Sequence, residues 1–375
     1  MNSQSRPILR RAALLAVALL GAGFCVGYGY GAGRRTVVSD PTPPAIKGMR
    51  VSLDGKLLGF TATYDNARLA SRFILDLGTK RYDAREAPSG WQDYVSGWTR
   101  DGKVLLEREK IPRPADDAEA GFYEEEVSAT SKGIAPQEPS LLSGESLNAQ
   151  DKVIGGFLDP DDRLVVRTHR EPKGAFALRD GEPELLARTD AQFYQLRAVR
   201  ENGSVAYYVV RDMPGPTKQA ALFRIQGGVT RRLGPAWDAP SWVYLREDGR
   251  QLVVCHKLEG EDAGWNWTLS EVTARSVTER KSAKIPADVI AVYWSPDGKA
   301  LLGTGGDDVW IVDAAKLQAR KLPRRPGNVT WNADNAAWLN NNTVLIAVDG
   351  VLWRISTQGK SAPELVWSVP AKYWK

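Results

Sequence analysis

Short apolar stretches joined by Asp-Gly or Asn-Gly pairs recur along this chain from Val51 to Val348. The clearest copy begins at Trp294, turns at Asp297-Gly298 and continues through an apolar stretch to Leu302. A two-residue hairpin turn needs a positive φ, which Gly adopts freely and Asn or Asp more readily than most residues. Each copy therefore predicts two antiparallel strands joined by a tight turn.

Seven copies of this hairpin occur at intervals of 41 to 60 residues. Their second turn residues are Gly55, Gly102, Asp162, Gly203, Gly249, Gly298 and Asn342. The interval is about the length of one four-stranded propeller blade, and no stretch after residue 40 shows a sustained helical period. The pattern predicts an all-β fold, a β-propeller of seven four-stranded blades. Six blades remain possible if the degenerate unit around Asp161 elaborates its neighbour.

The phrase from Trp294 to Lys299, followed by the strand Val309–Asp313, resembles the repeats of TolB-like, WD40-related β-propellers, also called PD40-type repeats. The resemblance extends over roughly Lys47 to Trp367. It implies a fold and says little about function, because such propellers serve as periplasmic binding platforms, as gating domains of serine peptidases and occasionally as lyases. The chain lacks the separate α/β domain that precedes the propeller of TolB, so the role of TolB does not transfer.

The N-terminal region, residues 1–35, predicts a membrane segment. Three arginines precede an uncharged stretch of 22 residues from Ala12 to Gly33, and two follow it. As a helix this stretch would span about 33 Å, enough for a hydrocarbon core of about 30 Å. The sequence Gly31-Ala32-Gly33 is a poor cleavage site, which favours a retained signal anchor in a bacterial cytoplasmic membrane. The alternative is a cleaved signal peptide that releases the chain into the periplasm.

Residues 36–46 contain several prolines and predict a short, stiff linker before a propeller at residues 47–375. A complete first strand, from Ile46 to Val51, indicates that the first blade is built from its own sequence. The alternative is closure of the ring by the C-terminal stretch Leu365–Trp367. With the anchor retained, the propeller would lie in the periplasm or outside the cell, close to the membrane.

The charge distribution argues against nucleic acid as a partner. The formal charge of +5 arises entirely from the arginines of the N-terminal region, and the other 45 Lys and Arg residues balance 45 Asp and Glu residues. Those arginines are Arg6, Arg10, Arg11, Arg34 and Arg35. The two cysteines, Cys25 and Cys255, offer no sensible intrachain disulfide, and Cys255 is expected to be buried.

The sequence contains no nucleophile elbow, His-Glu-x-x-His, Walker loop or Cys-x-x-Cys motif. The two histidines, His169 and His256, fall at equivalent positions of non-adjacent blades, and their spacing does not resemble a metal site. We therefore predict no cofactor, no metal and no catalysis. A hydrolase or lyase that uses carboxylates in the central channel remains an alternative, because sequence spacing says nothing about distances across the channel.

Long connections at the face opposite the Asp-Gly turns carry the predicted binding site. They extend from Ile111 to Gly121, from Arg211 to Lys218 and from Glu259 to Trp265, and such loops on a rigid scaffold commonly carry recognition. The candidate residues are aromatic anchors within a charged rim. They are Trp265, Trp267, Glu259, Glu261, Asp262, Asp116, Asp117 and Arg211. The alternative for the two tryptophans is that both pack inside the blades.

These observations predict an extracytoplasmic propeller that binds a protein partner or a ligand without catalysing a reaction. A purely structural component of the cell envelope is a further alternative. The sequence does not identify the partner.

Overall fold

The computed structural model describes only part of the chain, all of it within the compact unit Thr42–Lys375. The described residues are 43–63, 70–110, 120–125, 127–130, 133–136, 140–141, 153–168, 174–179, 182–188, 193–213, 219–238, 241–258, 264–285, 289–305, 308–323, 336–359 and 361–374. The membrane segment predicted at residues 12–33 lies outside them. Among the described residues, no helix has the length and hydropathy needed to cross a membrane.

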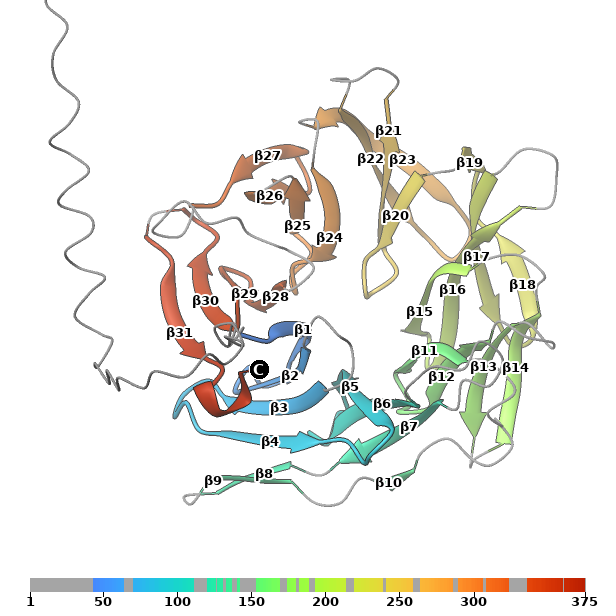
Figure 1. Cartoon of the computed structure of the whole chain (residues 1–375). Coiled ribbons are helices and arrows are strands. Elements are labelled where there is room, and N and C mark those ends of the chain that lie inside the picture. Colours follow the sequence, from blue (N-terminus) through green and yellow to red (C-terminus); the bar gives the residue numbers. More distant parts are fainter. Residues whose placement is uncertain are drawn as a thin grey trace, which may run out of the picture. The chain divides into compact units, whose positions relative to one another are not determined.

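Strands dominate the described part of the chain, as the alternating pattern predicts. Seven antiparallel sheets of four or five strands follow one another in chain order, and we number them first to seventh (Figure 1). The first contains β1 (Ala45–Val51), β2 (Leu57–Thr63), β3 (Ala70–Asp76) and β4 (Tyr82–Glu86). The second contains β5 (Trp91–Trp98), β6 (Val104–Lys110), β7 (Ala120–Glu125) and β10 (Ser140–Leu141). The third contains β11 (Val153–Leu158), β12 (Leu164–Thr168), β13 (Gly174–Arg179) and β14 (Glu182–Arg188).

The remaining four sheets repeat this order. The fourth contains β15 (Phe193–Glu201), β16 (Ser204–Asp212), β17 (Gln219–Gln226) and β18 (Val229–Arg232), with β19 (Trp237–Asp238) also paired to β17. The fifth contains β20 (Ser241–Leu245), β21 (Gln251–Lys257), β22 (Trp265–Val272) and β23 (Val277–Ile285). The sixth contains β24 (Ile290–Trp294), β25 (Ala300–Gly305), β26 (Asp308–Asp313) and β27 (Gln318–Lys321). The seventh contains β28 (Ala336–Asn340), β29 (Thr343–Val348), β30 (Val351–Ser356) and β31 (Glu364–Ser368), followed by the short 3-10 helix η3 (Ala371–Tyr373).

One sheet departs from simple succession. Between its third strand, β7, and its outermost strand, β10, the second sheet contains the separate hairpin β8 (Val127–Thr130) and β9 (Gly133–Pro136). This insertion falls in the longest of the intervals between repeated turns. The strands on both sides of Asp161, β11 and β12, belong to a sheet of their own.

All seven predicted turns join the first and second strands of a sheet, as expected. In six of the seven turns the second turn residue has a positive φ, as at Gly298 with 68° and at Asp162 with 57°. The expected two-residue turn occurs only in the fourth and seventh sheets, and the loops of the other five are longer. In the complete copies a hydroxyl closes the turn. Ser295 Oγ accepts a hydrogen bond from the Ala300 amide at 2.9 Å and donates one to Asp297 at 2.8 Å. The repeat thus specifies both the backbone and its local hydrogen bonds.

Indole groups join the first strands of successive sheets. The N–H groups of Trp98, Trp294 and Trp338 each donate to a backbone carbonyl in the first strand of the preceding sheet. The donor–acceptor distances are 2.9 Å to Arg50, 3.0 Å to Tyr244 and 3.3 Å to Tyr293. The aromatic residues therefore connect the sheets with directional bonds as well as apolar contact.

The first and seventh sheets lie side by side (Figure 1). They pack against each other through one shared core cluster of side chains. The rings of Phe60 and Phe73 are stacked with centroids 5.2 Å apart, and Trp367 of β31 meets them edge-on at 5.8 and 5.9 Å. Both end strands stay in sheets of their own sequence, because β1 pairs with β2 and β31 pairs with β30. The prediction that the first blade is self-contained is confirmed, and the described part of the chain forms a β-propeller.

Candidate functional site

Each sheet has two distinct ends, and the predicted site belongs to one of them. The repeated turns lie at one end, which we call the turn end. The second and third strands are connected at the other, which we call the loop end; the three long predicted connections, between β6 and β7, β16 and β17, and β21 and β22, lie there. The topology thus separates the hairpin turns from the longer loops, as predicted.

The two tryptophans selected from the sequence are buried. Trp265 and Trp267 belong to β22, where they are 8% and 0% exposed. They share a core cluster with Leu269 of the same strand and with residues of the sixth sheet such as Leu301 and Val312. Alternate residues of β22 face that neighbouring sheet, so both indoles pack between sheets and are not exposed anchors. This is the packing alternative that the sequence left open.

Five acidic candidates lie outside the described residues. They are Asp116, Asp117, Glu259, Glu261 and Asp262. Their place in the site stays a prediction.

Arg211, the remaining candidate, lies at the loop end of the fourth sheet. It is half-buried, with its guanidinium carbon 4.3 Å from the centroid of the Phe223 ring. Burial lowers the pKa of the guanidinium from its ordinary value. Within the described part of the chain the guanidinium has no hydrogen bond or ion pair, so its donors remain available to an external acceptor.

One exposed tryptophan is not among the residues predicted from the sequence. Trp242 in β20 is 51% exposed, although it lies on the same rung as buried Cys255 and Trp267. Trp242 lies on the first strand of the fifth sheet, near the loop end and beside the exposed end of β21 at His256. Alternation alone does not separate Trp242 from half-buried Tyr244 on the same face, so the sequence held no signal for its exposure.

The metal alternative gains nothing from the described residues. They contain no group of three or more His, Cys, Asp and Glu side chains that could hold a metal ion. His256 is exposed at the end of β21, and His169 lies outside the described residues. Cys255 is fully buried, as predicted.

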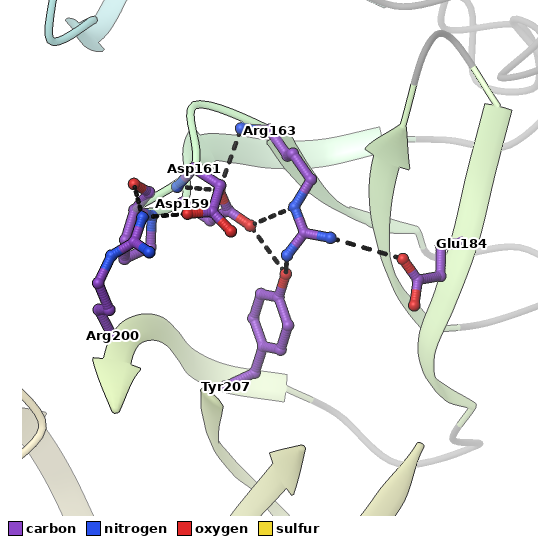
Figure 2. Close-up of polar contacts among 7 residues, drawn as sticks. Asp159, Asp161, Arg163, Glu184, Arg200 and Tyr207 are labelled. Atoms are coloured by element: carbon purple, nitrogen blue, oxygen red, sulfur yellow. Dashed lines mark hydrogen bonds and ion pairs between the residues drawn. The ribbon is translucent and has the colours of Figure 1, made fainter. Parts of the chain in front are cut away.

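The turn end of the third sheet contains a buried polar cluster (Figure 2). Asp159 takes the place of the closing hydroxyl, and its Oδ1 accepts from the backbone amides of Asp161 at 2.7 Å and Arg163 at 3.0 Å. Its Oδ2 accepts from Arg163 Nε at 2.9 Å and from the Tyr207 hydroxyl of the fourth sheet at 2.8 Å. Arg163 Nη2 in turn donates to the Tyr207 oxygen at 2.7 Å. One carboxylate therefore closes its own turn and joins two sheets.

Two further ion pairs extend this cluster (Figure 2). Arg163 Nη1 lies 3.6 Å from Glu184 on β14, and Arg200 of the fourth sheet pairs with Asp161 and donates to the Pro160 carbonyl at 2.9 Å. Burial, followed by the hydrogen bond to Asp159, raises the pKa of Tyr207. The phenol keeps its proton at neutral pH and serves as a donor. The cluster therefore holds the third and fourth sheets together.

Comparison with known proteins supports the fold. No family model matches the chain, and no curated protein matches it. Among solved structures, one of two prolyl endopeptidases matches with a TM-score of 0.54 and 15% identity, over 83% of this chain and 46% of that chain. The hydrazine synthase of Kuenenia stuttgartiensis matches with a TM-score of 0.51 and 15% identity, over 88% of this chain and 99% of that chain. TolB from Acinetobacter baumannii matches with a TM-score of 0.41 and 13% identity, over 79% and 76% of the two chains.

At these identities the likeness concerns the fold alone. The neighbours also include TolB and a WD40 domain. The seven described sheets confirm, at the level of fold, the β-propeller predicted from the repeats.

Proposed function

We propose that this chain is a non-catalytic binding platform, a seven-bladed propeller whose loop end captures a protein partner. The seven sheets of four or five strands support the blade number. The observation that carries the binding proposal is the 51% exposed indole of Trp242 near the loop end. A large exposed aromatic on a rigid strand costs little conformational entropy on binding and commonly anchors an interface.

Charge and hydrogen-bonding capacity around this end support the same reading. Arg211 offers a half-buried guanidinium without a bonding partner among the described residues, and His256 is exposed beside the first strand of the fifth sheet. The predicted acidic residues from 259 to 262 belong to the connection that follows β21. An aromatic anchor with polar groups around it is the usual composition of a protein interface.

We favour binding over catalysis because the polar side chains described above bond to one another within the scaffold. Asp159, Arg163 and Tyr207 satisfy one another across two sheets, and Glu201 and Arg224 do so within the fourth sheet at 2.5 Å. These groups hold the scaffold together. A rigid scaffold with adaptable loops at one end suits recognition.

The place of action that we propose is the outer side of a bacterial cytoplasmic membrane, with residues 1–35 as a single-pass anchor. The uncharged stretch from Ala12 to Gly33 between flanking arginines supports this location. Protease added to intact spheroplasts should digest the propeller and spare cytoplasmic markers. Full protection of the propeller until the cells are lysed would contradict the location.

The binding proposal is tested by in-cell crosslinking and affinity capture with full-length Trp242→Ala. The matched control is Leu53→Ala, because Leu53 is 74% exposed and lies in a turn at the opposite end. Loss of a central aromatic anchor costs 2 kcal/mol or more, so recovery of the specific partner should fall roughly 30-fold in the first variant and not in the second. Equal recovery from both variants, with unchanged unfolding midpoints, would remove the loop end of the fifth sheet from the proposal.

A further inference from the structure

A pocket at the turn end of the fifth sheet is distinct from the loop end. It has a volume of about 250 Å³ and is lined mainly by three arginines, one carboxylate and a buried leucine. The lining residues are Arg246, Arg250, Gln251, Leu269, Ser270, Glu271 and Arg280. Leu269 is 6% and Ser270 4% exposed, so buried residues of β22 contribute to the pocket lining beside the arginines.

Arg246 stands at a turn position where three other turns have a hydroxyl, while the third, fourth and seventh turns have Asp159, Arg200 and Leu339. The three hydroxyl residues are Ser52, Thr99 and Ser295, in the first, second and sixth turns. Each of those hydroxyls accepts a backbone hydrogen bond within its own turn, at 2.8 to 2.9 Å. An arginine side chain cannot accept such a bond, because its guanidinium group has only donors and no acceptor atom. The fifth turn therefore lacks this local hydrogen bond, and its first residue brings a cation to the turn end instead.

Arg246 is held in place by its neighbours. Its Nη1 donates to Gln251 Oε1 at 3.0 Å, and its Nη2 donates to the Asp297 carbonyl of the sixth sheet at 3.2 Å. Gly298 of the next turn lies directly against the guanidinium, where a Cβ would collide with it. The guanidinium of Arg246 is therefore a positive charge held in a fixed position at the pocket.

The other two arginines differ in how they are paired. Arg280 donates to Glu271 through Nε at 2.8 Å. The guanidinium of Arg250, an exposed residue, has no hydrogen bond or ion pair in the described part of the chain. Three guanidinium groups thus face one lining carboxylate, and Asp248 pairs with Arg246 from beside the pocket at 3.2 Å. The lining remains positively charged.

We propose that this pocket binds a phosphate group. Inorganic phosphate or a phosphomonoester carries between one and two negative charges at neutral pH, which matches the excess of guanidinium groups. The planar guanidinium fork suits phosphate oxygens. The volume lies below the usual 300–1,000 Å³ of small-molecule sites, so a single headgroup fits better than a nucleotide. Its source is either a free phosphate compound or a phospholipid headgroup.

The first test is calorimetric titration of the full-length chain with inorganic phosphate at constant ionic strength. Arg250→Ala and Arg280→Ala should each weaken binding at least ten-fold. The matched control is Lys299→Ala, which removes a cation from the same turn position of the sixth sheet, where the side chain is 86% exposed. Equal weakening in the control, unchanged binding in both arginine variants, or no saturable binding by the wild-type chain would overturn the proposal.

The second test separates the two sources. Vesicles of phosphatidic acid in phosphatidylcholine are sedimented with the wild-type chain and with Arg250→Ala, with and without competing phosphate. Arginine-dependent sedimentation that phosphate suppresses assigns a lipid headgroup. Arginine-dependent phosphate binding without any effect of the variant on sedimentation assigns a soluble phosphate compound.

Discussion

The turns of the third and sixth sheets are copies of one hairpin with different residues at the first position. They share one backbone hydrogen bond: the Asp162 amide donates to the Asp159 carbonyl at 2.9 Å, and the Gly298 amide donates to the Ser295 carbonyl at 2.8 Å. The third turn is one residue shorter, since the Asp159 amide donates to Arg163 and the Ser295 amide to Ala300. The sixth turn uses a hydroxyl that bonds within its own turn. The third uses a carboxylate whose side chain is 0% exposed and that also bonds an arginine and the tyrosine of the next sheet. The repeat thus determines the backbone, while one residue determines whether a turn is local or joins two sheets.

Replacing the first residue of each turn gives the largest expected effect. Asp159→Ala leaves the guanidinium of Arg163 and the hydroxyl of Tyr207 without their shared acceptor, and breaking a buried pair costs about 4 kcal/mol. Ser295→Ala removes a neutral acceptor and should cost about 1 kcal/mol. Denaturant unfolding of both variants measures the difference. Equal losses of unfolding free energy would show that the third turn is as local as the sixth.

The backbone side of the comparison is tested with glycines at the second turn position. Gly249→Ala would place a methyl group 2.9 Å from Val199 and 3.2 Å from Tyr208 of the fourth sheet, at a φ of +70°. Left-handed strain and overpacking together predict a loss of about 3 kcal/mol. Gly55→Ala is the control, with a φ of +73° and open space around it, and should cost about 1 kcal/mol. If Gly249→Ala lost no more unfolding free energy than Gly55→Ala, the side chains of the fourth sheet would be able to move and make room for the added methyl group.

Removing one hydroxyl from the cluster should have a smaller effect. Tyr207→Phe deletes a donor to a buried carboxylate and should cost about 2 kcal/mol. The double variant with Asp159→Ala should lose less unfolding free energy than the two single variants together, because both substitutions remove the same interaction. Strict additivity of the unfolding free energies would indicate that the phenol contributes to stability through packing alone.

The smallest effect concerns acid titration of a hydroxyl-closed turn. The hydrogen bond from Ser52, and then the Lys56 amide, lower the pKa of Asp54 from its ordinary value. A lowered folded-state pKa contributes stability that is present above the unfolded pKa of about 3.9 and is lost as pH falls through the folded pKa. In Ser52→Ala the NMR titration midpoint of Asp54 should move upward toward the ordinary value. An unmoved midpoint would assign the shift to the backbone instead of the hydroxyl.

The sequence was most informative about the backbone. A positive φ at one position of six turns restricts residue choice so strongly that the hairpins and their order along the chain could be read directly. The longest interval falls where the hairpin of β8 and β9 interrupts the second sheet. The return of the chain to that sheet through β10 was not predictable, because a strand of two residues has no periodicity of its own.

The sequence was least informative about which side chains reach solvent. Alternation assigns a residue to one face of a strand but does not say what covers that face. Trp267 and Trp242 share a rung, yet one is 0% and the other 51% exposed. The role of Asp159 was hidden for a similar reason. Its partner Tyr207 is remote in sequence, and only the stacking of the sheets brings the two together.

The side-chain packing between the first and seventh sheets also affects how the chain folds during synthesis. As the chain emerges from the ribosome, the first sheet is complete long before the strands that cover Phe60 and Phe73, which begin only at Ala336. Because no main-chain hydrogen bond joins the described residues of these two sheets, early sheets can pair fully and still present an aromatic face to water. Nascent chains with such faces are prone to aggregate and bind chaperones. The chain therefore remains prone to aggregation until the last sheet has been synthesised and covers this aromatic face.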